Sequence, residues 1–321
     1  MRTYRLMTAM LGLLLATGGA QAQQNYPTKP VRVVIPFAPG GGVDIVGRLL
    51  GARLTDEFRQ QFIADNRSGA GGTVGYDIAA KAPADGYTLL MVNSGVAYVP
   101  ALYPKLPYNT LKDLTGIGLI GATPSVLVVN NTVAAKSVKE LIALMKAKPG
   151  QINYGASVGG TLHLAVALFE EMAGVKGTLI PYKGGGPALI DTVGGQVQMM
   201  IVPMTSAIGH IKANRLRALG ASGARRSPML PELPTLAEAG VPGYEYTTWY
   251  GLLAPAATPK AIIATLNQSV VKALGNAELR DKFTQQGLEV ESSTAEQFSA
   301  LLKQEVARWG KIIKAAKIQG E

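Results

Sequence analysis

The hydrophobic pattern of the chain alternates short β-branched runs with stretches of helical spacing, and glycine-rich loops join the two. The first unit runs from residues 31–35 through a proline-bounded glycine turn into a helix at 44–58. A second unit has a strand at 62–64 and a helix at 74–81, and another strand follows at 87–92. These steps predict an α/β fold with a parallel sheet, in which ligands lie beyond the carboxyl ends of the strands.

The middle of the chain repeats this pattern between two long extended segments. Residues 115–129 and 244–254 are both apolar and extended, and we expect each to cross between two lobes. The predicted first lobe comprises residues 23–127 together with 245–321. The predicted second lobe comprises residues 128–244, inserted into the first, which is the layout of a hinge protein.

Local signals predict where several elements begin or break. The residues 121–124, with their glycine and proline, are expected to interrupt the first crossing segment. Thr258 is expected to cap a helix that has Pro259 at its first position. A closing helix is expected at 293–316, with Glu296 completing a capping box on Ser293.

A short motif occurs once in each predicted lobe. An Ile-Pro-aromatic corner at 35–37 is followed by three glycines at 40–42, and a second corner at 180–182 is followed by three glycines at 184–186. The alternative is chance similarity between two ordinary glycine loops. Two such loops on facing lobes would hold one ligand from both sides.

The first glycine loop has the chemistry of an anion site. The first N–H groups of a helix have no internal partner and carry the positive end of the helix dipole, and glycine lets the backbone approach a ligand closely. The loop could therefore hold a phosphate, a carboxylate or another oxyanion. A nucleotide is disfavoured, because the sequence lacks the G-x-x-x-x-G-K-[ST] motif and the glycines 40–42 lack the G-x-G-x-x-G spacing.

The first 22 residues are a predicted signal peptide. Arg2 and Arg5 form a short cationic segment, an apolar core follows, and Ala20-Gln21-Ala22 is a small-x-small cleavage site. The apolar run is shorter than a membrane-spanning helix requires. We expect cleavage after Ala22 and export of the mature chain.

Composition narrows the classes of function. The 321 residues include no cysteine, which excludes disulfides, thiolate metal sites and cysteine nucleophiles. Only two histidines, His163 and His210, are present, so we expect no metal and no cofactor. The net charge of +10 comes from scattered Lys and Arg rather than a basic run, which favours small anions over nucleic acid as ligands.

The most specific alternative to a binding function is that of a secreted serine esterase. Residues 155–159 match the G-x-S-x-G elbow with Ser157 as nucleophile, and Asp191 and His210 follow in the order of α/β hydrolases. His210, however, falls in the middle of a predicted helix. His163 lies on the helix that directly follows the serine loop, so neither histidine is well placed as a base and we expect no catalytic residues.

The glycine motifs, taken together, resemble those of the Bug family, the extracytoplasmic solute receptors of tripartite tricarboxylate transporters. They are Pro39-Gly40-Gly41-Gly42-x-Asp44, Asn66-Arg67-x-Gly69-Ala70-Gly71-Gly72, Ala84-Asp85-Gly86-Tyr87-Thr88-Leu89, Tyr154-Gly155-Ala156-Ser157-x-Gly159-Gly160-x-x-His163-Leu164 and Pro181-Tyr182-Lys183-Gly184-x-x-Pro187-Ala188-x-x-Asp191. The resemblance covers essentially the whole mature chain. It implies a periplasmic, two-lobed binding protein of type II with a two-stranded hinge, a Venus flytrap that performs no catalysis.

The resemblance also implies the ligand and the partners. Such a receptor closes on a small di-, tri- or aromatic carboxylate and offers it to integral membrane transporter subunits. We expect a monomer. A ligand-binding module of a signalling system is a third interpretation, because it would share the same fold.

The family pattern implies which residues meet the ligand. One carboxylate is expected at the loops 37–44 and 155–161, where backbone N–H groups and hydroxyls are the donors, and the other end of the ligand near Asn93, Ser94 and the segment after Val202. The expected ligand-binding residues are Phe37, Gly40, Gly41, Gly42, Asp44, Asn93, Ser94, Ser157, Gly160, Thr161, Met204 and Thr205.

Some individual positions keep alternative interpretations. Many family members carry an acidic residue and an asparagine where this chain has Val202-Pro203, which disfavours an amine-bearing ligand and favours a di- or aromatic carboxylate. Asp44 could contact a ligand amine, order a water molecule or cap its own helix. Asp191 is expected to be a structural partner within the second lobe, and Met199 and Met200 are expected in a strand core.

Overall fold

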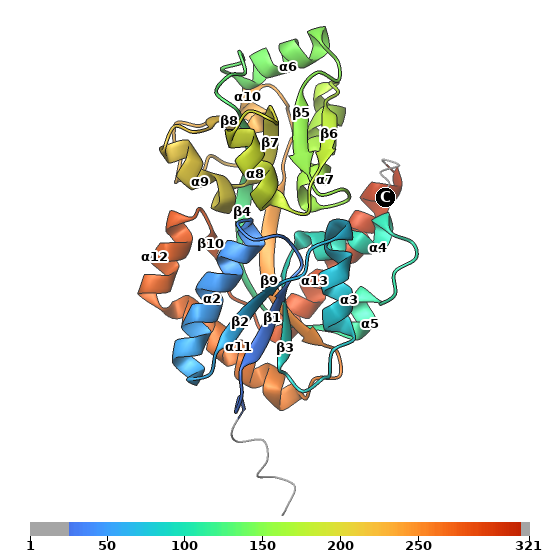
Figure 1. Cartoon of the computed structure of the whole chain (residues 1–321), viewed down its shortest axis with the longest axis vertical. Helices are drawn as coiled ribbons and strands as arrows, with labels where there is room; N and C mark the ends of the chain where they lie inside the picture. Colours follow the sequence, from blue (N-terminus) through green and yellow to red (C-terminus); the bar gives the residue numbers. More distant parts are fainter. Residues whose placement is uncertain (1–25, 316–321) are drawn as a thin grey trace, which may run out of the picture.

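The molecule consists of two α/β lobes, which lie one above the other in Figure 1. The computed structural model describes residues 26–315, so the predicted signal peptide at residues 1–22 and its cleavage site lie outside the described residues. Strands β4 (Leu114–Val129) and β9 (Thr247–Pro255) run from one lobe toward the other as an antiparallel pair. Their register extends from Leu114 opposite Pro255 to Pro124 opposite Thr247.

The lower lobe is built on the predicted strand-to-helix units. Strand β1 (Val31–Ile35) pairs in parallel with β2 (Phe62–Asn66) and β3 (Thr88–Asn93), whereas β9 joins β3 antiparallel and β10 (Glu289–Val290) joins β4 antiparallel. Its helical elements are α2 (Gly42–Phe58), η1 (Ala70–Gly72), α3 (Thr73–Ala80), η2 (Ser94–Ala97), α4 (Val99–Leu102), α5 (Thr110–Asp113), α11 (Lys260–Gly275), α12 (Ala277–Gln285) and α13 (Ala295–Ala315).

The upper lobe repeats this architecture around the second half of β4. Its strands are β5 (Asn153–Ala156), β6 (Thr178–Pro181), β7 (Met199–Pro203) and β8 (Arg217–Ala221). Strand β5 is parallel to β6 and β7, and β4 lies antiparallel between β7 and β8. Its helices are α6 (Val138–Ala147), α7 (Thr161–Ala173), α8 (Gly185–Val193), α9 (Met204–Lys212) and α10 (Leu236–Ala239).

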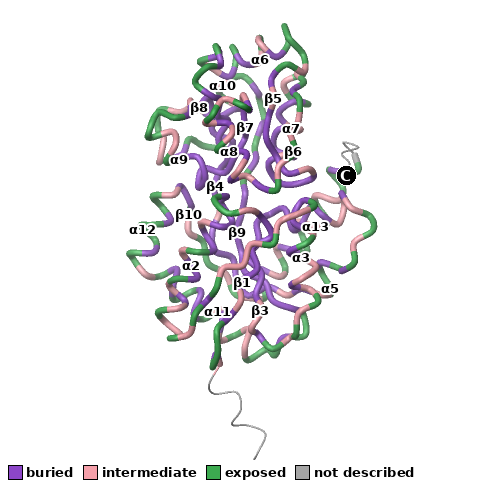
Figure 2. Tube along the Cα trace, viewed as in Figure 1, coloured by how far each residue is buried: buried purple, intermediate pink, exposed green. Residues whose placement is uncertain are grey.

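The strands form the buried centre of each lobe and the helices shield them from water, as the colours of Figure 2 show. The run 126–129 in β4 is fully buried at every position, which is typical of a strand covered on both faces. Met199 and Met200 in β7 are also fully buried, so the prediction that they belong to a strand core is confirmed.

The predicted break in the first crossing segment is wrong. Strand β4 continues through residues 121–124, because neighbouring strands on both sides supply partners there: Gly121 and Ala122 lie opposite β10 as well as β9. The irregularity is absorbed earlier in the strand, where the register against β9 shifts between Gly116 and Gly118 and again between Leu119 and Gly121.

Two predicted helix caps are also wrong. Helix α11 begins after Pro259 with no side-chain cap, so Thr258 does not cap it. At α13 the reciprocal capping pair is Thr294 with Gln297, one residue later than predicted, with hydrogen bonds of 3.1 and 2.9 Å. Ser293 is used elsewhere, because its Oγ accepts the N–H of Leu119 in β4 at 3.0 Å.

Candidate ligand-binding site

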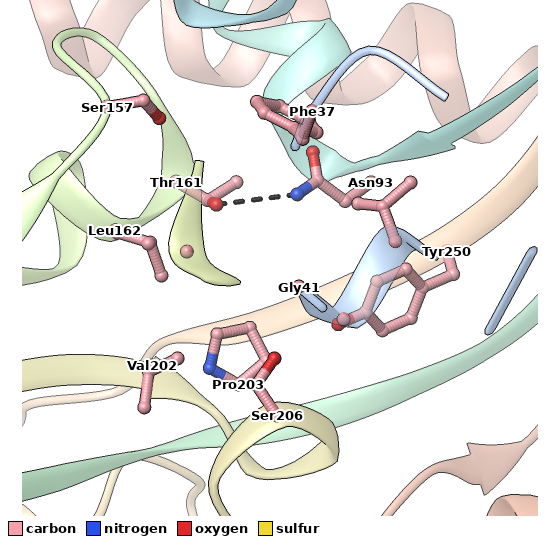
Figure 3. A pocket seen from close by; sticks show the side chains of 13 residues that line it. Phe37, Gly41, Asn93, Ser157, Thr161, Leu162, Val202, Pro203, Ser206 and Tyr250 are labelled. Carbon is pink, nitrogen blue, oxygen red and sulfur yellow. Dashed lines mark hydrogen bonds between the residues drawn. The ribbon is translucent and has the colours of Figure 1, made fainter. Parts of the chain in front are cut away.

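A small cavity of about 30 Å³ lies between the two lobes (Figure 3). It is located at the carboxyl ends of β1, β3, β5 and β7, where ligands of α/β proteins are usually found. The residues that line it are Phe37, Gly41, Gly42, Val43, Asn93, Ser157, Thr161, Leu162, Gly185, Val202, Pro203, Ser206 and Tyr250.

Helix N-termini from both lobes converge on this cavity. Among the described residues, helices α2, α7, α8 and α9 begin there, and their N-cap residues are Gly41, Gly160, Gly184 and Pro203. None of these four N-caps supplies a side-chain hydrogen bond, so the first N–H groups of each helix are not satisfied by a cap. The four positive helix ends favour a negative charge in the space between them.

The side chains of the lining add neutral hydrogen-bonding groups and no charge. Within the described part of the chain, no Lys, Arg, Asp, Glu or His lines this cavity, and the polar side chains are hydroxyls and one amide. An anion would therefore be held by N–H and O–H donors rather than by an ion pair. Such a lining also lacks an acidic partner for an ammonium group.

Asn93 and Thr161 connect the two lobes at the edge of the cavity. Asn93 Oδ1 accepts the N–H of Gly95 at 3.0 Å, and its Nδ2 donates to Thr161 Oγ1 at 3.4 Å (Figure 3). The carbonyl of Thr161 accepts the buried hydroxyl of Tyr246 at 2.9 Å. These hydrogen bonds hold the Asn93 side chain and the Thr161 backbone in position within the protein itself.

Tyr250 and Thr205 form a second polar pair beside the start of α2. Their hydroxyl oxygens are 3.1 Å apart, and burial raises the pKa of Tyr250 above its ordinary value, so the phenol stays protonated. A Cβ atom on Gly42 would overlap the Tyr250 hydroxyl and lie 2.7 Å from Thr205 Oγ1. The close approach of α2 to this pair therefore requires glycine at position 42.

Ser206 contributes a hydroxyl that the sequence did not single out. It lies in the first turn of α9, its side chain is 8% exposed, and its Oγ has no hydrogen-bond partner among the described residues. Buried hydroxyls are normally paired. An unpaired hydroxyl that lines a cavity at a helix N-terminus indicates a place for a ligand acceptor atom.

Asp44 supports the glycine loop from behind. Its Oδ2 accepts the N–H of Gly40 at 3.0 Å, and its Oδ1 accepts Arg48 and Asn66, each at 2.9 Å. Burial tends to raise the pKa of this carboxyl, but these three donors outweigh it and hold the pKa below its usual value. In the structure these hydrogen bonds give Asp44 a loop-stabilising role, which was not among the three interpretations left open by the sequence.

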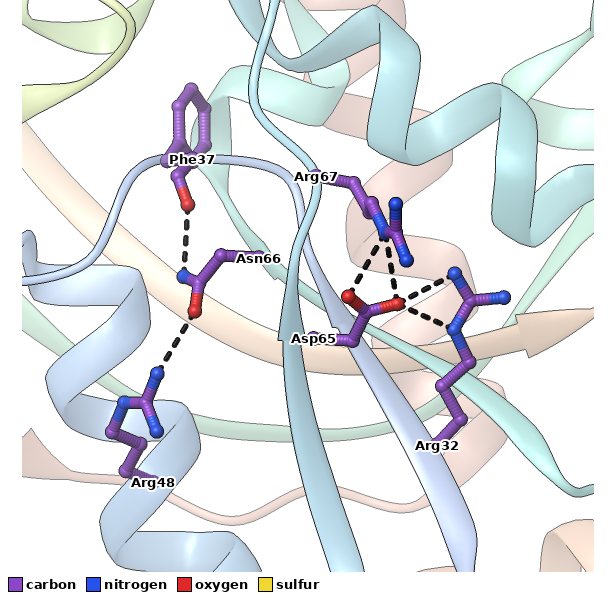
Figure 4. A network of polar contacts seen from close by, with 6 residues as sticks. All are labelled: Arg32, Phe37, Arg48, Asp65, Asn66 and Arg67. Carbon is purple, nitrogen blue, oxygen red and sulfur yellow. Dashed lines mark hydrogen bonds and ion pairs between the residues drawn. The ribbon is translucent and has the colours of Figure 1, made fainter.

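Asn66 extends this support to the cavity wall. Its Nδ2 donates to the carbonyl of Phe37 at 2.9 Å and its Oδ1 accepts from Arg48 at 2.9 Å (Figure 4). Next to it, Asp65 accepts hydrogen bonds from both Arg32 and Arg67, and these neighbours help to keep the pKa of Asp65 below its ordinary value although burial opposes them. The end of β2 thus orders the loop that carries Phe37.

The structure divides the expected ligand-binding residues into two groups. Those that line the cavity are Phe37, Gly41, Gly42, Asn93, Ser157 and Thr161. Those that do not are Gly40, Asp44, Ser94, Gly160, Met204 and Thr205. Each residue of the second group is the sequence neighbour of a residue that lines the cavity. Some of them support the loops: for example, the Gly160 N–H donates to the Ser157 carbonyl at 2.9 Å.

The lining residues absent from the expected set come from five segments of the chain. They are Val43 in α2 and Leu162 in α7, both beside expected residues, Gly185 in the second glycine motif, Val202, Pro203 and Ser206 around the start of α9, and Tyr250 on β9. Gly185 could have been found by extending the repeat argument to its second copy. Ser206 lies in the segment after Val202, where ligand contacts were expected, although it was not itself named. Tyr250 carries no local signal, because only the packing of β9 against the cleft brings it there.

The geometry around Ser157 does not assemble a catalytic triad. His163 Nδ1 accepts the backbone N–H of Gly159 at 3.1 Å, so this nitrogen supports the loop. Burial lowers the pKa of His163 below its ordinary value, which keeps the ring neutral. His210 lies on α9, and Asp191 accepts the Tyr182 hydroxyl at 2.5 Å, as expected for a structural partner within the second lobe.

Residues 46–318 match the family described as tripartite tricarboxylate transporter family receptor. The chain belongs to this family. Among its curated relatives is the protein BugT of Bordetella pertussis, 36% identical over 314 residues that cover 96% of each chain. The resemblance to the Bug family that the glycine motifs indicated is therefore confirmed. The receptors of this family are not enzymes, so the esterase interpretation is wrong.

Solved structures with the same fold include two from Rhodopseudomonas palustris. One is Rpa4515 with adipate, 37% identical, covering 92% of this chain and 99% of its own with a TM-score of 0.88. The other is MatC with bound malate, 32% identical, covering 90% and 100% with a TM-score of 0.84. The predicted two-lobed periplasmic binding-protein fold is confirmed, and the chain is a solute-binding receptor of that class.

No helix within residues 26–315 is long and apolar enough to cross a membrane. In the same range, no group of three or more His, Cys, Asp or Glu side chains is arranged to hold a metal ion.

Proposed function

We propose that this receptor binds a small carboxylate in the cavity between its lobes and delivers it to the integral membrane subunits of a tripartite tricarboxylate-type transporter. The observation that carries the proposal is the convergence of four helix N-termini without side-chain caps on one uncharged, hydroxyl-lined cavity. The ligands named for Rpa4515 and MatC, adipate and malate, are both carboxylates and support this choice.

The proposed mechanism is closure of two lobes about two strands. The lobes are residues 23–127 with 245–321 and residues 128–244, and the hinge is formed by β4 and β9 where they pass between the lobes. A ligand that touches both lobes stabilises the closed form only by the contacts it makes in that form alone. The cavity lining comes from both lobes, which satisfies this condition.

The proposed contacts to the carboxylate are of two kinds. Backbone N–H groups at the starts of α2 and α8 come from Gly42 and Gly185, the first residues of those helices. Hydroxyl donors come from Ser157, Thr161 and Ser206. Because no acidic side chain lines the cavity within residues 26–315, an ammonium group on the ligand has no partner there, and hydroxy or unsubstituted acids are favoured over amino acids.

Export of the mature chain to the periplasm and action as a monomer belong to the same proposal. A receptor that serves a transporter must meet its solute outside the inner membrane, and the predicted signal peptide at residues 1–22 provides that route. Each molecule carries both halves of the cavity, so binding needs no second copy.

Isothermal calorimetry and thermal unfolding with the purified mature protein test the binding step. The panel comprises succinate, malate, adipate and benzoate, with the corresponding amides and aspartate as matched controls. A binding acid should raise Tm by several degrees at about 100 times Kd, because this concentration adds about 2.7 kcal/mol of stability. No shift with any acid, or an equal shift with acids and amides, would contradict the proposal.

Uptake assays test the delivery step. Reconstituted membrane subunits should accumulate the bound acid only when the receptor is present. A receptor that binds the acid but never supports uptake by such subunits would instead favour the signalling module.

A further inference from the structure

We propose that the ligand site extends into a second cavity on the other side of Phe37 and Ser157, where Lys183 pairs with the distal acidic group of an extended dicarboxylate. This inference rests on the proposed function, because it assumes that one carboxylate is anchored among the helix N-termini. It assigns a role to the glycine loop at residues 69–72 and to Lys183, which the anchoring site leaves without one.

The second cavity adjoins the first. It has a volume of about 230 Å³, and Phe37 and Ser157 line both cavities. The lower lobe contributes the glycine loop 69–72, and the upper lobe contributes Val158 and the corner 181–183. A ligand that passes between Phe37 and Ser157 would therefore enter a space that is again shared by both lobes.

The sizes of the two cavities favour a ligand that occupies both. The first cavity, at about 30 Å³, has room for a water-sized polar group such as one end of an acid, but not for a whole dicarboxylate. The second is several times larger. A ligand anchored by one carboxylate at the first cavity must place the remainder of its chain beyond it, and the shared wall of Phe37 and Ser157 leads to the second cavity.

The charge in the second cavity favours an acidic distal group. Lys183 is the one charged residue among the described residues that line it. Across residues 26–315, the Lys183 ammonium makes no hydrogen bond or ion pair, although its carbonyl accepts the Ala38 N–H at 3.3 Å. Asp191, the carboxylate of the same motif, accepts the hydroxyl of the neighbouring Tyr182. The cation is therefore available to a ligand.

The walls of the second cavity are joined where the lobes meet. The Tyr103 hydroxyl of the lower lobe donates to the Val158 carbonyl of the upper lobe at 3.0 Å. Gly71 lies against both groups, since a Cβ atom there would be 3.0 Å from each of the two oxygens. A ligand long enough to reach Lys183 would make an additional contact in the closed form. A longer ligand would therefore stabilise the closed form as well as bind more tightly.

Calorimetry with a length series tests the proposal. The ligands are the α,ω-dicarboxylates from succinate to suberate, each compared with its monomethyl ester, which keeps the length but lacks the second charge. The variants are Lys183→Gln, Lys183→Glu and, as the matched control, Lys212→Gln, which removes an exposed lysine of α9. Equal Tm values before ligand addition show that the variants are folded.

We expect the longer diacids to bind wild type more tightly than their monoesters by about two- to five-fold, because Lys183 is exposed and this is the range for an ion pair in contact with solvent. Lys183→Gln should abolish this ratio and leave monoester affinity unchanged. Lys183→Glu should invert the ratio, and Lys212→Gln should retain it. The ratio should also fall as salt is added.

The outcomes separate this inference from the proposed function. Diacids and monoesters that bind equally in wild type, or a ratio that survives in Lys183→Gln, would overturn the second subsite and leave a carboxylate receptor. Failure of every acid to bind wild type would overturn the proposed function and the second subsite with it.

Discussion

Gly186 of the upper lobe packs directly against the carbonyl of Pro39 in the lower lobe. A Cβ atom on Gly186 would overlap the Pro39 oxygen and lie 3.1 Å from the carbonyl carbon of Gly40. The two residues belong to the two copies of the glycine motif, and the Ala38 N–H donates to the Lys183 carbonyl in the same region. The two glycine loops thus touch each other, and their contact requires a residue without a side chain.

Gly186→Ala should therefore oppose closure without unfolding either lobe. The added methyl group meets backbone atoms of the other lobe, which cannot move aside as a flexible side chain could. We expect carboxylate affinity to fall by at least about ten-fold, equivalent to about 1.4 kcal/mol, and small-angle scattering to show a larger radius of gyration.

Gly209→Ala is the matched control for this variant. Gly209 lies within α9 of the same lobe, and no atom outside its helix lies within 4 Å of the position of its Cβ. Alanine there should preserve affinity and raise stability by up to about 1 kcal/mol. If Gly186→Ala binds carboxylates as wild type does, the loop contact does not govern closure.

Ser206→Ala should weaken binding while leaving the ligand-free protein as stable as wild type or more stable. The Ser206 Oγ has no hydrogen-bond partner among the described residues, so its removal deletes no bond within the protein. A hydrogen bond to a charged ligand is worth about 1.5–3 kcal/mol, which corresponds to a loss of affinity of about ten-fold or more. Calorimetry and thermal unfolding of the same sample measure both quantities, and a loss of Tm with unchanged affinity would refute the assigned role.

Asp44→Ala should lower stability strongly. The carboxylate accepts hydrogen bonds from Gly40, Arg48 and Asn66, and its loss would leave these donors without their acceptor. We expect the free energy of unfolding in urea to fall by about 2–4 kcal/mol. Glu278→Ala, which removes an exposed helical ion pair with Lys282, should change it far less than Asp44→Ala does, because solvent screens exposed charges. Equal effects of the two substitutions would show that the Asp44 network contributes little.

Acid should lower the stability of the loop at residues 155–161, which carries Ser157, through protonation of His163. Burial holds the pKa of this ring below its ordinary value, with Glu170 raising it and Lys176 lowering it to lesser extents. The unfolded chain therefore binds the proton more readily than the folded one, so the stabilisation is complete above about pH 6.5 and is lost as the pH falls toward the folded-state pKa.

His163→Asn provides the comparison, because the asparagine Oδ1 is attached to Cγ as the histidine Nδ1 is and can accept the Gly159 N–H without titrating. The pKa of His210 is also lowered by burial, but His210 is present in both proteins and cancels in the difference. The Tm of wild type should fall more than that of the variant between pH 7.5 and 5. Parallel pH profiles would show that His163 does not couple the loop to acid.

Much of the fold followed from local patterns. The first strand-to-helix units, the two crossing segments and the occurrence of one glycine motif in each lobe were predicted, because periodicity and turn chemistry depend on neighbouring residues. The predictions that failed were those in which a local signal competes with a tertiary contact. Ser293 and Thr294 offer equivalent capping hydroxyls, and only the approach of β4, which takes the Ser293 hydroxyl for Leu119, decides which one caps α13.

The sequence by itself determined the fold class, the family and the loops that form the site, since each depends on motifs that are continuous in the chain. Tertiary structure decided which atoms of those loops face the cavity. Asp44, next to the glycines in sequence, turns away toward Arg48, whereas Tyr250 arrives from a strand about 200 residues later and meets Thr205 beside Gly42. The physical reason is that a cavity between lobes is formed by chain crossings, and no local pattern records which distant side chains those crossings bring together.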